Sequence, residues 1–264
     1  MYLDSNKTKK DIENKITNLQ IKISNTCNLN CKYCYANQGN YGKKDTLMSK
    51  ETAKKLAEKI NNIFPNIEKI SFFGGEPLLN IEAVEIIVSE LKNKKITYSL
   101  VSNTTIVNDN IINLLNNNNI KIISSLDGPQ KFNDINRISN SNQGSYNIIS
   151  QNLSKLLSQT KSLVMIEAVY SLPLYKEISK YELYKFFHEK FPTPFIGIGD
   201  VLTEDKELKL PEEYNLTRYN QIDIDIDFTI NKILNNEFIP VNSIYDIISK
   251  FLGKKPQHHF VALD

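Results

Sequence analysis

Residues 20–34 read QIKISNTCNLNCKYC and contain all three cysteines of the 264-residue chain, Cys27, Cys31 and Cys34. The first five of these residues alternate polar and apolar side chains, which predicts a β-strand that ends shortly before the cysteines. Thiolates bind soft metals and iron–sulfur clusters. Three thiolates leave one iron of a four-iron cluster without a protein ligand, and an open metal position generally marks catalysis rather than structure.

Two other uses of these cysteines are disfavoured. A disulfide would leave one of the three cysteines over, and nothing in the sequence suggests export. A structural zinc site usually needs a fourth ligand, and the histidines of the chain, His188, His258 and His259, all lie far along the sequence. Zinc therefore stays as the alternative to an iron–sulfur cluster.

The length and charge of the chain limit its class. A chain of this length can bury one substantial core, and α/β barrels commonly form a single domain at this size. The chain carries 32 Lys and Arg against 30 Asp and Glu, so it has no basic field and nucleic acid is a disfavoured partner. Residues 1–15 lack the apolar region of a signal peptide, and no later stretch is apolar for long enough to span a bilayer. We therefore expect a cytoplasmic protein with no membrane contact.

Six segments have the pattern of strands, and helical patterns separate them. Strands are predicted at residues 20–24, 69–73, 96–101, 120–126, 163–170 and 195–198. Helices are predicted near residues 49–62, 81–91, 109–115, 146–157 and 178–187. The strand segments are apolar on both faces, as buried parallel strands are. This alternation predicts an α/β fold with parallel strands, and six units suit a partial (β/α)6 TIM-like barrel.

The carboxyl ends of the predicted strands carry the unusual motifs, and parallel barrels build their active sites at this end. Gly74-Gly75-Glu76 follows the second strand, Ser102-Asn103 ends the third, and Ser125 ends the fourth. A glycine pair lets the backbone approach a ligand closely, and the carboxylate of Glu76 suits an ammonium group. The hydroxyl and amide of Ser102-Asn103 can bond sugar hydroxyls. Taken alone, each motif also fits an ordinary turn or loop.

Together, the motifs resemble those of the radical S-adenosylmethionine (SAM) superfamily. The matching features are the cysteine spacing with Tyr33 before the third cysteine, the Gly-Gly-Glu turn, and the run from Ser125 to Pro129 followed by Arg137. The resemblance covers roughly residues 20–200 and extends to the core domain of the SPASM-type branch that matures peptides and sulfatases. That branch often has a histidine where this chain has Asn133, so the role of that histidine is not carried over.

The resemblance implies a cofactor and a contact for each motif. The three cysteines would hold a [4Fe–4S] cluster, and Gly74-Gly75-Glu76 would bind the amino group of SAM. Ser125 and Arg137 would contact the SAM carboxylate, Arg137 through its planar fork of donors. Tyr33 would lie beside the adenine, and Ser102-Asn103 would reach the ribose. A surface ion pair is the alternative use of Arg137.

The implied reaction is reductive cleavage of SAM to methionine and a 5′-deoxyadenosyl radical, which abstracts hydrogen from a peptide or protein substrate. A reductant such as flavodoxin or ferredoxin would supply the electron. Two alternatives stay open: a radical SAM enzyme that acts on a small metabolite or RNA, and a non-catalytic iron–sulfur protein.

The expected organisation is a lead-in at residues 1–19, the core barrel at residues 20–200 and a mostly helical segment at residues 201–264. No cysteine follows Cys34. We therefore expect either a chain truncated before the cysteine-rich SPASM or twitch module, or a single-cluster enzyme. The alternating aspartates of residues 222–228 are expected to form a solvated face rather than a metal site.

Overall fold

The computed structural model describes residues 13–193, 195–214, 231, 234 and 235. Six strands form one sheet in the order β1-β2-β3-β4-β5-β6, and every neighbouring pair is parallel. The strands are β1 Asn18–Ser24, β2 Lys69–Gly74, β3 Thr97–Ser102, β4 Lys121–Ser125, β5 Val164–Tyr170 and β6 Phe195–Asp200. This architecture confirms the predicted α/β fold with six parallel strands.

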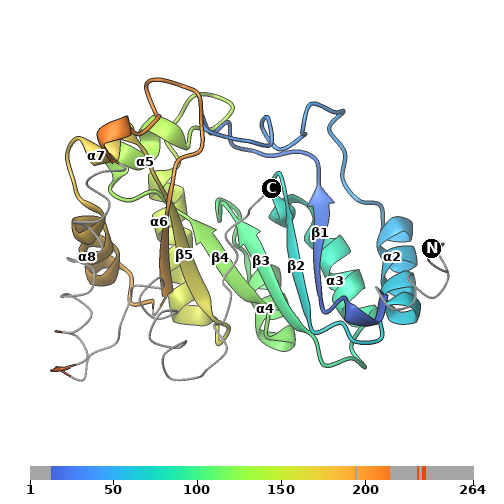
Figure 1. The fold of residues 1–264 in the computed structure, drawn as a ribbon. Helices are drawn as coiled ribbons and strands as arrows, with labels where there is room; N and C mark the ends of the chain where they lie inside the picture. The colour runs from blue at the N-terminus through green and yellow to red at the C-terminus, as the bar shows by residue number, and fades with distance from the viewer. Residues whose placement is uncertain (1–12, 194, 215–230, 232–233, 236–264) are drawn as a thin grey trace, which may run out of the picture.

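The long helices connect consecutive strands and lie on the outer face of the curved sheet (Figure 1). They are α2 Lys50–Ile63, α3 Ile81–Glu90, α4 Asp109–Asn118, α6 Tyr146–Gln159 and α8 Lys180–Lys190. Three short helices follow strands directly, at the carboxyl end of the sheet. They are η1 Pro77–Asn80 after β2, α5 Gln130–Asn136 after β4 and α7 Leu172–Tyr175 after β5.

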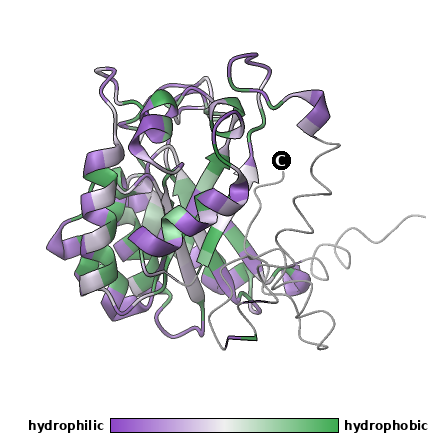
Figure 2. Ribbon diagram, turned by 90° about the vertical axis from the view of Figure 1, so that its left-hand side faces the viewer, coloured by the Kyte–Doolittle hydropathy of each residue, from purple (hydrophilic) through white to green (hydrophobic). Residues whose placement is uncertain are grey.

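Helix α2 forms where the sequence predicts it, because capping and periodicity agree. Ser49 caps the helix, and its hydroxyl oxygen accepts a hydrogen bond from the backbone N–H of Thr52 at 3.1 Å. The buried residues Ala53, Ala57 and Ile60 recur at helical spacing. Hydrophobic and hydrophilic residues alternate along the helices (Figure 2), and the buried apolar ones of α2 belong to the core.

The two faces of the sheet differ in chemistry. Strand side chains that point toward the helices are buried and apolar, as are Phe72 and Leu100. The neighbouring residues in the strand point to the other face, and many are polar. Ser71 and Ser99 pair across β2 and β3, and their hydroxyls share a hydrogen bond of 2.6 Å. The inner face is therefore suited to polar ligands, whereas the outer face forms the core. The prediction that the strands are apolar on both faces is wrong for the inner face, because polar side chains such as Ser71 and Ser99 lie there and bind one another.

Helix α5 lies in a connection that the sequence pattern does not predict to be helical. Its buried residues include two asparagines, so it shows no apolar periodicity. Asn133 accepts a hydrogen bond from the backbone N–H of Asp127 at 3.3 Å, and Asn136 donates one to the hydroxyl of Ser171 at 3.2 Å. Tertiary hydrogen bonds thus stabilise a helix that local sequence signals do not indicate.

Several predictions concern residues that the structure does not describe. Most of the predicted helical segment at residues 201–264 lies outside the described residues. The aspartates of residues 222–228, His258 and His259 also lie outside them. Each helix among the described residues is too short or too polar to span a bilayer.

Candidate active site

The three cysteines lie in the loop that follows β1, and this loop crosses the carboxyl end of the sheet toward α5 (Figure 1). Each thiol is partly buried, and none forms a disulfide. The backbone N–H of Asn30 donates to the carbonyl of Ile138 at 2.7 Å, and that of Lys32 donates to the carbonyl of Asn136 at 3.0 Å. These bonds hold the cysteine loop against the end of α5.

The Gly74-Gly75-Glu76 turn packs against the backbone just before Cys27. The pairing of β1 and β2 continues into the turn, because the N–H groups of Gly75 and Glu76 donate to the carbonyls of Ser24 and Thr26, both at 2.9 Å. A Cβ atom on Gly75 would lie 2.1 Å from the carbonyl oxygen of Thr26. A Cβ atom on Gly74, whose φ is +150°, would lie 2.2 Å from the carbonyl oxygen of Ser24. Both positions therefore need glycine for the end of β2 to approach the cysteine loop.

The carboxylate of Glu76 is buried, with 1% of the residue exposed, and ties the ends of β2 and β3 together. Its Oε1 accepts hydrogen bonds from the N–H of Leu78 at 2.9 Å and the hydroxyl of Ser102 at 2.7 Å. Its Oε2 accepts one from the N–H of Asn103 at 2.7 Å. Burial raises the pKa of Glu76 to about 7, although these three hydrogen bonds act in the opposite direction.

Asn103 connects the end of β3 to the first cysteine. Its side-chain Nδ2 donates to Asn28 Oδ1 at 2.9 Å and to Cys27 Sγ at 3.6 Å. The N–H of Leu29 also donates to Cys27 Sγ, at 3.4 Å. Burial raises the pKa of Cys27 to about 11, and both hydrogen bonds act in the opposite direction.

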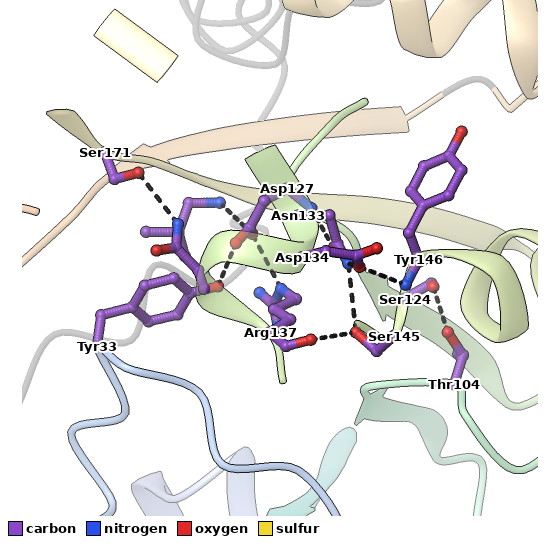
Figure 3. Close-up of polar contacts among 12 residues, drawn as sticks. Tyr33, Thr104, Ser124, Asp127, Asn133, Asp134, Arg137, Ser145, Tyr146 and Ser171 are labelled. Atoms are coloured by element: carbon purple, nitrogen blue, oxygen red, sulfur yellow. Dashed lines mark hydrogen bonds and ion pairs between the residues drawn. The ribbon is translucent and has the colours of Figure 1, made fainter. Parts of the chain in front are cut away.

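Tyr33, Asp127 and Arg137 form a cluster on the α5 side of the cysteine loop, in which Asp127 and Arg137 are buried and Tyr33 is partly buried (Figure 3). The carboxylate of Asp127 accepts hydrogen bonds from Arg137 Nε at 3.0 Å, from the N–H of Val169 at 3.0 Å and from the hydroxyl of Tyr33. The guanidinium carbon of Arg137 lies 5.5 Å from the centre of the Tyr33 ring. Burial is the largest single influence on the pKa of Arg137 and lowers it, but Asp127, Tyr33 and Cys31 together outweigh burial and raise the pKa. Because Arg137 is 7% exposed, this is a buried pair and not a surface ion pair.

Arg137 also influences groups on the loop and on the inner face of the sheet. Burial raises the pKa of Cys31 to about 12, and the charge of Arg137 acts in the opposite direction. Ser125 of β4 pairs in register with Glu167 of β5, so both side chains point to the inner face near its carboxyl end. Burial raises the pKa of Glu167, and Arg137 again opposes the shift.

The predicted site residues all lie at one end of the sheet, but their hydrogen bonds divide them into two groups. Gly74-Gly75-Glu76 and Ser102-Asn103 lie on the Cys27 side, whereas Tyr33 and Arg137 lie on the α5 side. Sequence patterns assign no role to Asp127 or Glu167. The one signal for Asp127 is its place in an Asp-Gly-Pro run directly after a strand, and the position of Glu167 depends on strand pairing.

The family described as the Radical SAM superfamily matches residues 21–170. The chain belongs to this superfamily. This radical SAM chain is 26% identical to the cysteine-type anaerobic sulfatase-maturating enzyme of Clostridium novyi over 250 residues, which are 89% of the chain and 65% of that enzyme. It is 35% identical to the radical SAM cyclopropyl synthase TigE of Paramaledivibacter caminithermalis over 133 residues, which are 44% of the chain and 28% of that enzyme.

The fold of this radical SAM chain also resembles the structure of native anSMEcpe with bound AdoMet. The TM-score is 0.77 at 23% identity, over 91% of this chain and 68% of that one. The chain thus spans between about a quarter and two thirds of the two curated relatives. The sulfatase-maturating relative and the structural likeness agree with the predicted resemblance to the maturase core.

The buried pair of Asp127 and Arg137 predicts a large loss of stability when it is broken. Asp127→Asn leaves the charge of Arg137 buried without its partner, which costs about 3–5 kcal/mol. The matched control is Glu82→Gln, which breaks the Lys50–Glu82 pair at 2.6 Å, whose side chains are 68% and 56% exposed. That change should cost about 1 kcal/mol or less. Urea denaturation measures both, and equal losses would contradict the buried pairing.

The raised pKa of Glu76 predicts a pH dependence of stability. The folded chain holds the Glu76 proton more tightly than the unfolded chain does, so the free energy of unfolding falls as pH rises from 4.5 to about 7. A shift of this size corresponds to about 3 kcal/mol across that range. Glu76→Gln should flatten the curve by about that amount between pH 4 and pH 8 in the metal-free protein. Parallel curves for the two proteins would show that Glu76 does not titrate in this way.

Proposed function

We propose that this radical SAM chain binds a [4Fe–4S] cluster through Cys27, Cys31 and Cys34, cleaves SAM reductively and modifies a peptide or protein. The observation that supports it most is the placement of the cysteine loop. One loop carries all three thiols across the carboxyl end of a parallel sheet, between the Gly74-Gly75-Glu76 turn and Arg137. Parallel barrels build their catalytic sites at this end.

The donor set fits an iron–sulfur cluster better than a single zinc ion. Zinc needs its ligands to converge on one point, and the described part of the chain contains no group of three Cys, His, Asp or Glu side chains that could hold one ion. A four-iron cluster instead takes each thiolate on a different iron, so the three sulfurs need not converge. Coordination deprotonates thiols. Arg137 beside Cys31, and the N–H donors on Cys27, would stabilise the resulting thiolates.

The residues around the loop suit the charged groups of SAM. When bound, the cluster supplies the electron that splits SAM into methionine and a 5′-deoxyadenosyl radical. The bond from Nε to Asp127 orients the guanidinium of Arg137 and leaves its Nη groups to bind a carboxylate. We assign Ser125 to the same carboxylate, because it pairs in register with Glu167, whose pKa Arg137 influences. We assign the SAM amino group to the Gly74-Gly75-Glu76 turn and the adenine to the neighbourhood of Tyr33.

The ribose assignment rests on the family resemblance. It places the ribose near Ser102-Asn103, whose side chains in this structure already bind Glu76, Asn28 and Cys27. We further propose that residues 20–200 form the catalytic core, with residues 1–19 and 201–264 flanking it.

Peptides or proteins are the proposed substrate class because of two similar proteins. The Clostridium novyi relative is a sulfatase-maturating enzyme, and anSMEcpe has also been solved with AdoMet and the Cp18Cys peptide. A small protein reductant such as flavodoxin or ferredoxin would deliver the electron. Mass spectrometry after anaerobic incubation with candidate peptides distinguishes this substrate class from small metabolites.

Anaerobic reconstitution with iron and sulfide tests the cluster. The wild-type chain should take up about four irons and, once reduced, form 5′-deoxyadenosine from SAM. Replacing any of the three cysteines by alanine should abolish both. Lys32→Ala is the matched control, because this exposed residue of the same loop is not a thiol, and it should behave as wild type. Full iron uptake by a cysteine variant, or 5′-deoxyadenosine formation without iron, would overturn the assignment.

A further inference from the structure

Cys27 differs from the other two cysteines in the hydrogen bonds that its sulfur accepts. The backbone N–H of Leu29 donates to it at 3.4 Å, and the side-chain amide of Asn103 donates at 3.6 Å. Within the described part of the chain, the sulfurs of Cys31 and Cys34 accept no hydrogen bond. One of the two donors on Cys27 therefore comes from the residue directly after β3, 76 residues further along the chain.

The orientation of the Asn103 amide follows from its partners. Its Oδ1 accepts hydrogen bonds from the backbone N–H of Thr105 at 3.0 Å and from the Thr105 hydroxyl at 2.7 Å. A backbone N–H can only donate, so the atom that faces it must be the oxygen. The Nδ2 group must then face Asn28 and Cys27, which places an N–H donor on the sulfur.

The segment that carries Asn103 is held on both sides. The backbone N–H of Asn103 donates to Glu76, and Asn103 itself is 7% exposed. The next residue, Thr104, has a φ of +52°, which is uncommon for a β-branched residue. Its hydroxyl shares a hydrogen bond of 2.7 Å with Ser124, and its carbonyl accepts one from Asn152 at 2.8 Å. The amide of Asn103 is thus presented to Cys27 by a rigid support.

We propose that Asn103 is a positioning residue that sets the reduction potential of the cluster by donating its amide N–H to the Cys27 sulfur. This inference rests on the cluster assigned under Proposed function. Hydrogen bonds to the sulfurs are among the factors that set the potentials of iron–sulfur clusters. An N–H dipole stabilises negative charge on the sulfur, and the reduced cluster carries one more negative charge than the oxidised one. The Asn103 donor therefore favours the reduced form, and this role commits its amide to the cysteine rather than to the ribose.

The test compares three variants of the reconstituted protein in a redox titration followed by electron paramagnetic resonance, without SAM. Asn103→Asp keeps the shape of the side chain and its bonds from Thr105 but removes the N–H donor. Asn103→Ala removes the whole amide. Asn40→Ala is the matched control, because Asn40 lies in the loop after the cysteines and its amide donates to Asp45 rather than to a sulfur.

Both Asn103 variants should shift the equilibrium between the reduced and oxidised cluster about tenfold toward the oxidised form. For a one-electron couple, this shift lowers the midpoint potential by about 59 mV. The shift should be larger for Asn103→Asp, because it places a negative charge near the sulfur. Asn40→Ala should leave the midpoint unchanged.

If Asn103→Ala fails to retain iron, the midpoint potential of Asn103→Asp alone tests the role of Asn103. A wild-type midpoint in an iron-loaded Asn103→Asp protein would overturn the role of Asn103 while leaving the cluster assignment intact. Failure of the wild-type chain to bind iron would instead overturn the proposed function.

Discussion

The continuation of the β1–β2 pairing past the ends of both strands is the interaction on which the site depends. The N–H groups of Gly75 and Glu76 donate to the carbonyls of Ser24 and Thr26. This contact leaves no room for a Cβ atom on Gly74 or Gly75. It brings the end of β2 against the start of the cysteine loop. It also directs the side chain of Glu76 inward, where it meets the end of β3. The first cysteine is therefore positioned by backbone geometry before any ligand contributes.

Two buried carboxylates lie on opposite sides of the cysteine loop, and they are stabilised differently. Asp127 has a cationic partner, Arg137, and also binds Tyr33 of the loop itself. Glu76 is held by three neutral donors, so burial leaves its pKa near 7. One side of the site thus has a buried ion pair, whereas the other has a carboxyl group whose pKa burial raises.

Local patterns predict the sheet but not the contacts that complete the site. The strands were predictable because each carries apolar residues at positions that the core buries, and the motifs at the strand ends share one edge in any parallel sheet. Helix α5 was not predictable, because its buried residues include two asparagines and it lacks an apolar periodicity. The placement of Glu167 beside Ser125 depends on the register of β4 and β5, which no local pattern encodes. The partners of Asp127 lie 94 residues before it and 10 and 42 residues after it, so its importance also emerges only from the fold.

The proposed function requires that the three thiolates leave one iron of the cluster open to SAM. Electron–nuclear double resonance of the reduced cluster with SAM labelled by ¹⁵N in its amino group tests this claim most directly. A direct iron–nitrogen bond should give a strong ¹⁵N hyperfine coupling that is absent with unlabelled SAM. A reduced cluster that binds SAM without any ¹⁵N coupling would contradict the open iron site.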